Sequence, residues 1–375
     1  MPEVTGRSPL RSLSAQGSAG LLVSGSRDGP SARTPSFDGT HRAPGSHEHS
    51  YRNLDTCEPS LQGRHPGSFA LMGKRAPGRF GAVATAMVTP FDDEGQLDLD
   101  GALSLARYLA DNGTEAVVLA GTTGESPVLS DPERLELFSV LAESLTIPVI
   151  AGSTTNDTAH SVELTRQAEA VGCAAILAVT PYYNRPSQLG LVRHFTAVAQ
   201  ATSLPVILYD IPLRTGRKIA TDTILQLARE VPNIVGVKDA AGDVSGTARL
   251  LAQAPEGFEC YSGEDALTLA LLSVGAVGGI CVASHWMGRE IGEMITSYLD
   301  GDVERARQVN AETLDFVAFQ SSDEAPNPMP AKAMLRAMDM SAGECRLPHG
   351  PAPAWLDERA GVVLAELEKW RVSRG

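Results

Sequence analysis

A lysine at the end of an apolar run is the first residue of this sequence that suggests chemistry. Lys238 directly follows the segment Ile234–Val237, which contains no polar side chain. Burial disfavours the charged ammonium form, and a lysine that loses its proton becomes an amine that can attack a ketone and form an imine. On position alone, Lys238 can equally be a rim lysine that reaches solvent.

A Gly-Thr-Thr-Gly turn at residues 121–124 offers a place for a small carboxylate. Its backbone N–H groups and the hydroxyls of Thr122 and Thr123 are donors that suit such a ligand. Ser/Thr/Gly sequences also form ordinary connections between a strand and a helix, so the turn by itself fits both interpretations.

Two further side chains suit a reaction at Lys238. The phenol of Tyr209 can carry protons if it lies beside a lysine, or it can be half buried with its hydroxyl hydrogen-bonded. Arg214 stands in a loop bounded by Pro212 and Gly216, where its planar guanidinium can bind a carboxylate or extend into solvent. Each residue taken alone leaves both interpretations open.

The elements that must position these side chains alternate in a regular rhythm. Eight short apolar runs, each followed by an amphipathic stretch, predict eight βα units. Parallel strands need helical crossovers and eight strands close a sheet, so the sequence predicts an α/β fold of the TIM (β/α)₈ barrel type at residues 78–300. The predicted strands are Val83–Val88, Ala116–Ala120, Pro148–Gly152, Ala174–Thr180, Val206–Tyr209, Ile234–Lys238, Glu259–Ser262 and Gly278–Ala283. The predicted helices are Leu99–Asn112, Asp131–Leu145, Asp157–Val171, Gln188–Thr202, Thr221–Glu230, Val244–Ala254, Asp265–Val274 and Met287–Leu299.

A doubly wound open sheet is the alternative architecture. It would carry a Gly-rich nucleotide-binding loop after the first strand, whereas this strand runs into Thr89-Pro90-Phe91. The barrel is therefore preferred, and the strand ends that carry the Gly-Thr-Thr-Gly turn, Tyr209 and Lys238 are expected to meet at one rim.

The segments on either side of the barrel have a different character. Residues 1–77 are rich in Ser, Gly, Arg, Pro and His and show no period of 2 or 3.6, so we expect a disordered leader. A transit peptide is a weaker interpretation of this segment, and Met72 is an alternative start. Residues 301–375 predict a C-terminal helical region, with helices at Asp302–Phe319, Met329–Met338 and Ala354–Arg371.

Composition favours small-molecule chemistry in a cytoplasmic protein. A formal net charge of −14 and a pI near 5.0 would repel nucleic acids and anionic membranes, and no apolar run is long enough to span a membrane. The five cysteines lack the spacing of a zinc site or a disulfide framework, so no metal is expected. His194, His285 and His349 have no serine or carboxylate at a useful spacing and are expected to be structural or exposed.

Taken together, these segments resemble the dihydrodipicolinate synthase (4-hydroxy-tetrahydrodipicolinate synthase) family, within the N-acetylneuraminate lyase superfamily. The resemblance extends from about residue 78 to the end of the chain. It rests on motifs in the family's order and close to its spacing, namely Gly121-Thr122-Thr123-Gly124-Glu125, Pro181-Tyr182-Tyr183-Asn184-Arg185-Pro186, Leu208-Tyr209-Asp210-Ile211-Pro212, Arg214-Thr215-Gly216 and Gly236-Val237-Lys238-Asp239-Ala240.

The resemblance implies four catalytic residues. Lys238 would form the Schiff base with pyruvate, and Tyr209 would donate and accept protons. Thr122 would link Tyr209 to Tyr183, which in this family reaches in from the neighbouring protomer. The chain is therefore expected to work as a homo-oligomer, which in this family is usually a dimer of dimers.

The resemblance also implies three substrate-binding residues. Thr123 would hold the pyruvate carboxylate, Ile280 would contribute a backbone carbonyl near the lysine, and Arg214 would bind the carboxylate of L-aspartate 4-semialdehyde. The expected reaction is a class I, pyruvate-dependent condensation of these two substrates to 4-hydroxy-tetrahydrodipicolinate. It belongs to lysine and diaminopimelate biosynthesis and needs no metal or organic cofactor.

Two other functions stay open at this point. Some relatives keep the lysine and the tyrosine but act on 2-keto-3-deoxy sugar acids or other hydroxy-keto acids, so a related aldolase or dehydratase is the alternative, although Arg214 favours the synthase. A non-catalytic keto-acid sensor is a remote alternative. In lysine-inhibited relatives a histidine and a glutamate stand where this chain has Asp131 and His160, so we expect weak or absent inhibition by L-lysine.

Overall fold

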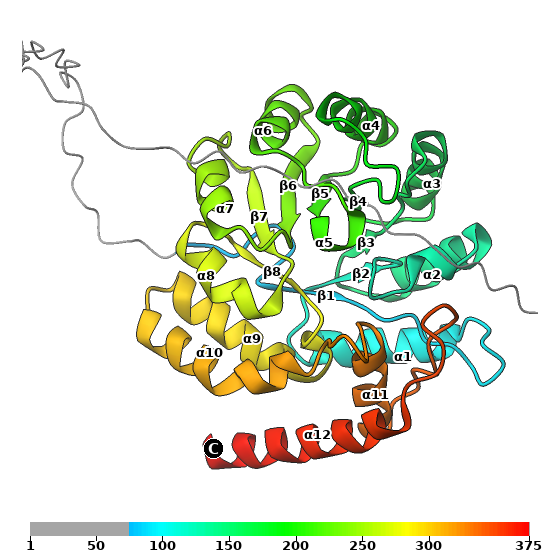
Figure 1. Cartoon of the computed structure of the whole chain (residues 1–375), viewed down its shortest axis with the longest axis vertical. Coiled ribbons are helices and arrows are strands. Elements are labelled where there is room, and N and C mark those ends of the chain that lie inside the picture. Colours follow the sequence, from blue (N-terminus) through cyan, green and yellow to red (C-terminus); the bar gives the residue numbers. More distant parts are fainter. Residues whose placement is uncertain (1–74, 375) are drawn as a thin grey trace, which may run out of the picture. The chain divides into compact units, whose positions relative to one another are not determined.

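The computed structural model describes residues 75–374, and their strands form a closed barrel (Figure 1). All eight strands are parallel and pair in sequence order, with β8 returning to β1. The open, doubly wound alternative is therefore wrong. The expected leader, its transit-peptide interpretation and Met72 lie outside the described residues, apart from residues 75–77. The strands are β1 (Val83–Ala86), β2 (Ala116–Leu119), β3 (Val149–Ala151), β4 (Ala175–Val179), β5 (Val206–Asp210), β6 (Ile234–Asp239), β7 (Glu259–Ser262) and β8 (Gly278–Cys281).

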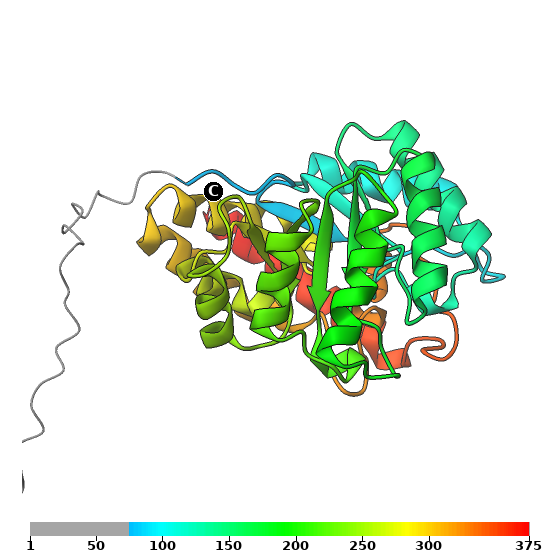
Figure 2. The same ribbon diagram turned by 90° about the horizontal axis from the view of Figure 1, so that it is seen from above.

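Helices follow the strands and form the outer layer of the barrel. Figure 2 shows helices running alongside the strands. This layer contains α1 (Leu99–Asp111), α2 (Asp131–Ser144), α3 (Thr158–Ala170), α4 (Gln188–Gln200), α6 (Thr221–Glu230), α7 (Val244–Leu251), α8 (Thr268–Ser273) and α9 (Ser284–Leu299). Shorter helical elements stand in the loops at η1 (Ser126–Val128), α5 (Pro212–Thr215) and η2 (Asp265–Leu267).

Local sequence explains where the first helices begin. Before α2, the Ser130 hydroxyl accepts from the backbone N–H of Glu133, while the Glu133 carboxylate accepts from the backbone N–H of Ser130. This capping box satisfies two N–H groups that have no partner inside the helix. Asp98 and Asp157 cap α1 and α3 with their carboxylates in the same way. The capped start of α2 therefore fixes the end of the segment that follows the Gly-Thr-Thr-Gly turn.

Most element boundaries follow the sequence prediction closely, and all eight strands lie within two residues of the predicted bounds. The predicted helix Asp265–Val274 is split into η2 and α8. The predicted helix Met287–Leu299 begins earlier, at Ser284, because a short helical turn precedes it across a kink at the non-helical residue Met287 (φ −144°). The elements η1 and α5 were not predicted, since three or four residues are too few to show a helical period.

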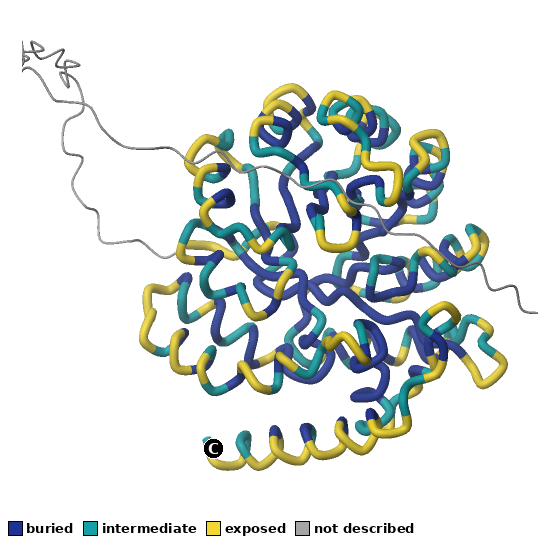
Figure 3. Tube along the Cα trace, viewed as in Figure 1, coloured by how far each residue is buried: buried dark blue, intermediate teal, exposed yellow. Residues whose placement is uncertain are grey.

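Apolar side chains pack in two layers on the two faces of the strands. Inside the barrel, alternate strand residues such as Ala84, Ile150 and Ile207 fill the interior. Outside it, the strands pack against the helices through side chains such as Leu105 and Phe138. Figure 3 shows the buried strands at the centre and the exposed outer faces of the helices. Within the described residues, no helix combines the length and apolarity that crossing a membrane requires.

Three helices follow the barrel, namely α10 (Val303–Ala318), α11 (Met329–Ala337) and α12 (Ala354–Arg374). α10 packs against α9, and α12 packs against α11 (Figure 1). Ion pairs also tie α12 to α9, with 2.7 Å between Arg371 and Glu290 and 3.0 Å between Arg374 and Glu293. The predicted C-terminal helical appendage is confirmed, and the loop between α11 and α12 reaches the candidate site.

Candidate active site

The carboxyl ends of β5 and β6 bring two predicted site residues together. In the strand register, Tyr209 of β5 stands beside Val179 of β4 on one side and Lys238 of β6 on the other. Paired residues of parallel strands lie at the same height of the sheet, so Tyr209 and Lys238 are direct neighbours. The rim of the barrel therefore places a phenol next to the amine.

Lys238 is held in a confined place. Only 4% of its surface is exposed, and its Nζ lies 4.4 Å from the centroid of the Tyr209 ring. Gly263, directly after β7, makes room for it, because a Cβ atom there would lie 2.9 Å from Cγ and Cε of Lys238. The amine is thus shielded from bulk water, which is the environment expected of an imine-forming lysine.

The charge of Lys238 acts on a nearby buried carboxylate, that of Asp265. Asp265 accepts hydrogen bonds from the backbone N–H groups of Val282 at 2.9 Å and Ala283 at 2.7 Å, and so fixes the turn from β8 to α9. Burial raises the pKa of Asp265, while these N–H groups and the charge of Lys238 oppose that rise. Among residues 75–374, no group of three or more His, Cys, Asp or Glu side chains is arranged to hold a metal ion.

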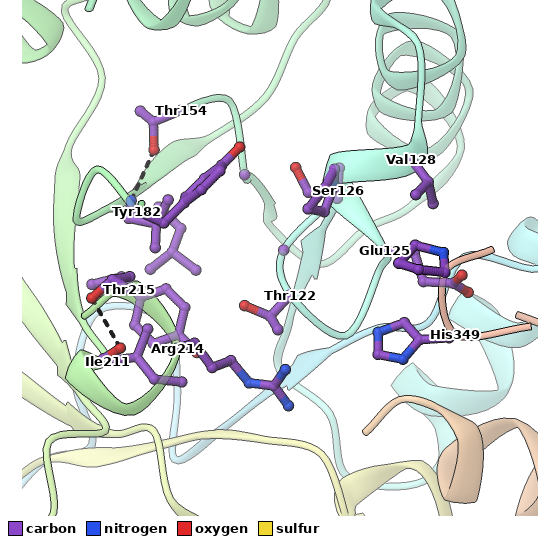
Figure 4. A pocket seen from close by; sticks show the side chains of 18 residues that line it. Thr122, Glu125, Ser126, Val128, Thr154, Tyr182, Ile211, Arg214, Thr215 and His349 are labelled. Carbon is purple, nitrogen blue, oxygen red and sulfur yellow. Dashed lines mark hydrogen bonds between the residues drawn. The ribbon is translucent and has the colours of Figure 1, made fainter. Parts of the chain in front are cut away.

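A cavity of about 260 Å³ opens at this rim (Figure 4). Its walls come from the turn after β2, the ends of β4 and β5, helix α5 and the loop before α12. Tyr209, Thr122 and Arg214 line it, and Figure 4 shows the guanidinium of Arg214 extending toward Thr122. Of the other predicted site residues, Lys238, Thr123 and Ile280 are buried and are not part of the lining, and Tyr183 is exposed outside it.

Thr123 is connected to Arg214 through an asparagine that the sequence analysis did not single out. The Asn327 side chain donates from Nδ2 to Thr123 Oγ1 at 3.0 Å, and its backbone carbonyl accepts from Arg214 Nη2 at 3.4 Å. Its Oδ1 is buried and has no hydrogen-bond partner among the described residues. No local motif could have revealed Asn327, because 204 residues separate it from Thr123.

A buried ion pair holds the Gly-Thr-Thr-Gly turn. Glu125 follows the turn with a left-handed backbone (φ 56°), and its carboxylate lies 2.8 Å from Nζ of Lys332, each side chain having 1% of its surface exposed. Burial lowers the pKa of Lys332, and the Glu125 carboxylate opposes that change. Within the turn, a Cβ at Gly124 would lie 3.0 Å from the backbone N of Ala120. The turn is closely packed, and it presents Thr122 from a fixed backbone.

The loop between α11 and α12 is fastened to this turn by one arginine. The backbone N–H of Arg346 donates to Oε2 of Glu125 at 2.9 Å. Its guanidinium donates to the carbonyls of Gly95 at 2.9 Å and Val128 at 3.0 Å. It also pairs with Glu133 at 2.5 Å, which lowers the pKa of that carboxyl to about 2. A segment remote in sequence thereby becomes a wall of the cavity.

Two residues of this loop, Pro348 and His349, line the cavity. His349 was expected from the sequence to be structural or exposed, and the structure places it half-buried in the cavity lining. The spacing argument considered only serine or carboxylate partners near in sequence, whereas His349 is positioned through the anchoring of Arg346 on Glu125. Figure 4 shows the His349 ring on the opposite side of the cavity from Tyr182.

Two neighbouring tyrosines behave differently. Tyr182 lines the cavity, whereas Tyr183 is 90% exposed and has a left-handed backbone (φ 71°), which is uncommon for a residue other than glycine. The next residue, Asn184, fixes the loop by donating from Nδ2 to the carbonyl of Asn156 at 2.9 Å. The protomer therefore turns Tyr183 away from its own cavity.

Two histidines are buried and neutral. His285 accepts on Nε2 from the backbone N–H of Val88 at 3.1 Å, and its Nδ1 lies 2.7 Å from the carbonyl of Val282. This pattern places the ring proton on Nδ1. Burial lowers the pKa of both His285 and His194 to about 4. Their contacts are structural, as the sequence analysis expected for these two residues.

The chain is similar to proteins of known family. Residues 79–364 match the dihydrodipicolinate synthetase family. The chain is 44% identical over 292 residues to the 4-hydroxy-tetrahydrodipicolinate synthase of Bacillus subtilis (strain 168), an alignment that covers 77% of this chain and 99% of the relative.

Solved structures agree with this match. The crystal structure of dihydrodipicolinate synthase DapA-2 from Bacillus anthracis superposes with a TM-score of 0.74 at 40% identity, covering 77% of this chain and 98% of that chain. The lysine-bound structure of the enzyme from Cyanidioschyzon merolae gives a TM-score of 0.73 at 41% identity, with coverage of 76% and 98%.

Proposed function

The chain belongs to the dihydrodipicolinate synthetase family, and we propose that it condenses pyruvate with L-aspartate 4-semialdehyde to 4-hydroxy-tetrahydrodipicolinate. The observation that carries this proposal is the pairing of Tyr209 with Lys238 beside a cavity whose wall holds Arg214. A shielded amine, a phenol in contact with it and a guanidinium facing the same space are the groups that this reaction uses.

The first half of the proposed reaction activates pyruvate. The Nζ of Lys238 attacks the keto carbon, and loss of one water molecule leaves an imine. The imine draws electrons from the methyl group, which loses a proton, so that the adduct becomes an enamine. Tyr209 and Thr122 both line the cavity, and we assign the phenol the role of proton carrier with Thr122 as its relay.

The second half joins the two substrates. The enamine carbon attacks the aldehyde carbon, and the aldehyde oxygen takes up a proton from Tyr209 to become a hydroxyl group. The amine of the second substrate then attacks the imine carbon, closes a six-membered ring and releases Lys238 as a free amine. Overall the two substrates lose the one water molecule that left when the imine formed. No metal or organic cofactor takes part in the proposed reaction.

Donors for the substrate carboxylates stand in two places. Because Asn327 donates to Thr123 Oγ1, the hydroxyl proton of Thr123 stays available for the pyruvate carboxylate. The backbone carbonyl of Ile280 on β8 is assigned to the lysine end of the same substrate. Arg214 is exposed at the cavity and bonded to a carbonyl through Nη2, so its remaining N–H groups can bind the carboxylate of the second substrate.

A neighbouring protomer completes the site in this proposal. The 90% exposure of Tyr183 supports its assignment to the cavity of a second copy, where it would join Thr122 and Tyr209 in the proton relay. The chain would then act as a homo-oligomer, for which the family suggests a dimer of dimers. A cytoplasmic location follows from the expected place in lysine and diaminopimelate biosynthesis.

The proposal is tested by trapping and turnover with the same preparation. The protein is incubated with pyruvate and borohydride, and peptide mapping then locates the reduced adduct. Turnover is measured with pyruvate and L-aspartate 4-semialdehyde, and Lys238→Arg is the matched control because it keeps a cation but removes the nucleophilic amine. We expect the adduct on Lys238 and turnover, with both lost in the variant.

The other outcomes separate the alternatives. An adduct on Lys238 without turnover would identify an aldolase or dehydratase with a different second substrate. An intact protein that forms no adduct would overturn the Schiff-base mechanism. Turnover would eliminate the non-catalytic sensor.

A further inference from the structure

The cavity contains a second basic side chain that the proposed reaction does not use. Among the described residues that line the cavity, only Arg214 and His349 carry basic groups. His349 is half-buried, and neither of its ring nitrogens has a hydrogen-bond partner within residues 75–374. A free imidazole in a substrate cavity is a candidate for contact with the substrate itself.

The backbone around His349 is fixed before any ligand arrives. Arg346 anchors the loop to Glu125 from one side. Glu344 anchors the loop as well. Its backbone carbonyl accepts from Nζ of Lys332 at 3.0 Å, and its side chain accepts from the N–H of Ala352, beyond His349, at 2.8 Å. Such preorganisation lowers the entropic cost of binding a ligand at the imidazole.

The neighbouring groups define what His349 can bind. Its partner across the cavity, Arg214, suits a carboxylate, so a second substrate that is an α-amino acid must place its ammonium group near an acceptor. The carboxylate of Glu125 is occupied by Lys332 and by the Arg346 backbone. The hydroxyl of Thr215 is already bonded within its own loop. The unpaired nitrogen of the imidazole is a stronger base than the remaining hydroxyls of the lining.

We propose that His349 binds the α-ammonium group of the second substrate. Arg214 then binds the carboxylate and His349 the ammonium group of the same amino acid. The site therefore favours an amino aldehyde over aldehydes that lack nitrogen. This inference rests on the proposed function and deepens it, because it names the group by which the second substrate is selected.

The test uses two ligands that differ only in the amino group. L-Homoserine keeps the carbon chain, carboxylate and ammonium of L-aspartate 4-semialdehyde but replaces the aldehyde by an alcohol, and 4-hydroxybutyrate lacks the ammonium. Their affinities for the protein with reduced pyruvate on Lys238 are measured by calorimetry in mildly alkaline buffer, where histidine is generally neutral. The proteins compared are wild type, His349→Met, His349→Gln and Leu347→Ala, the last being a control at an exposed position of the same loop.

We expect wild type to prefer L-homoserine by roughly tenfold or more, the typical effect of one hydrogen bond to a charged group. His349→Met abolishes this preference by weakening L-homoserine alone, and His349→Gln retains part of it because the amide oxygen is still an acceptor. In turnover, His349→Met raises the KM for L-aspartate 4-semialdehyde by a similar factor and leaves the KM for pyruvate and kcat unchanged. Leu347→Ala behaves as wild type.

The results that would overturn this inference differ from those that would overturn the proposed function. Formation of the pyruvate adduct in every variant establishes that the site is folded. If His349→Met keeps the preference, or weakens both ligands equally, His349 does not bind the ammonium group and the inference is overturned while the proposed function stands. If wild type forms the adduct but does not turn over L-aspartate 4-semialdehyde, the proposed function is overturned and this inference with it.

Discussion

Tyr209 and Lys238 are paired in the register of β5 and β6, and the lysine Nζ lies 4.4 Å from the centre of the tyrosine ring. The ring lies against the amine, and Tyr209 also lines the cavity. In the proposed reaction the ring shields the amine and the hydroxyl transfers the proton, so substitutions can separate the two roles.

Tyr209→Phe removes the hydroxyl and keeps the ring. We expect it to form the pyruvate adduct on Lys238 but to lose roughly 10²–10⁴-fold in kcat, the usual contribution of a general acid–base group. Borohydride trapping and steady-state rates measure the two effects. Tyr209→Ala, which removes the ring as well, is expected to impair trapping too. Wild-type kcat in Tyr209→Phe would show that another group carries the proton.

Gly263→Ala places a methyl group 2.9 Å from both Cγ and Cε of Lys238, which is closer than such atoms normally approach. The lysine must shift away from the pyruvate position, so we expect adduct formation and kcat/KM to fall at least about tenfold, with about 1–3 kcal/mol lost from the unfolding free energy by overpacking. Gly361→Ala in α12 is the control, since a Cβ there meets no atom within 4 Å. Unchanged trapping in Gly263→Ala would mean that Lys238 tolerates displacement.

Lys332→Met leaves the buried carboxylate of Glu125 without its partner. Breaking a buried ion pair on one side costs about 3–5 kcal/mol, which urea unfolding would record. The double variant with Glu125→Leu is expected to recover part of this loss, because no charge then stays buried. Arg166→Gln breaks an exposed pair with Glu163 and serves as the control, with a change of about 0–1 kcal/mol. Equal effects of Lys332→Met and Arg166→Gln would contradict the assignment.

His285 makes stability depend on acid pH. Its folded pKa of about 4 lies below the ordinary value of 6.5, so the unfolded chain binds its proton first. The stabilisation is complete above pH 6.5 and is lost as pH falls toward 4, by about 3 kcal/mol in total. Unfolding free energies across this range are expected to fall less steeply in His285→Gln. The control is the same change at the half-exposed His160, which should leave the pH dependence of the unfolding free energy as in wild type. If His285→Gln also shows the wild-type pH dependence, the argument is refuted.

His160 and Asp131 bind each other, with 2.8 Å between Nε2 and Oδ2. Each satisfies the other, so neither is free to bind L-lysine at the position implied for lysine-inhibited relatives. We expect millimolar L-lysine to leave the rate unchanged in a titration at constant substrate. The double variant Asp131→His, His160→Glu carries the implied residue types and is expected to gain sensitivity. Micromolar inhibition of wild type would refute the prediction.

The barrel could be predicted because its signals are local. Each strand is a short apolar run, and closure of parallel strands in sequence order then leaves little freedom in how Tyr209, Lys238 and the Gly-Thr-Thr-Gly turn are arranged. The positions of η1, α5 and the break at Met287 were not predictable in this way. Each depends on a single turn of backbone and on packing against neighbouring elements, and the hydrophobic periodicity of the sequence shows neither.

The site could be predicted only where its residues stand at strand ends. Asn327 and His349 come from segments after the barrel, and they reach the site through contacts that span 204 residues, from Asn327 to Thr123, and 221 residues, from Arg346 to Glu125. Neither segment contains a motif that points to the other end of the contact. The exposure of Tyr183 could be expected only from the family resemblance, which implies a place in a neighbouring protomer's site, and not from any local pattern.

The anchoring of Arg346 on Glu125 also sets when the site can exist during synthesis. At roughly 5–20 residues per second, the 221 residues between them take roughly 10–45 s to translate. Lys238 is made partway through that interval, and from then on it is present on the growing chain while one wall of its cavity has not yet been made. A nascent chain that ends before Arg346 would therefore lack the wall that His349 provides, so the cavity is complete only after this segment beyond the barrel has been made.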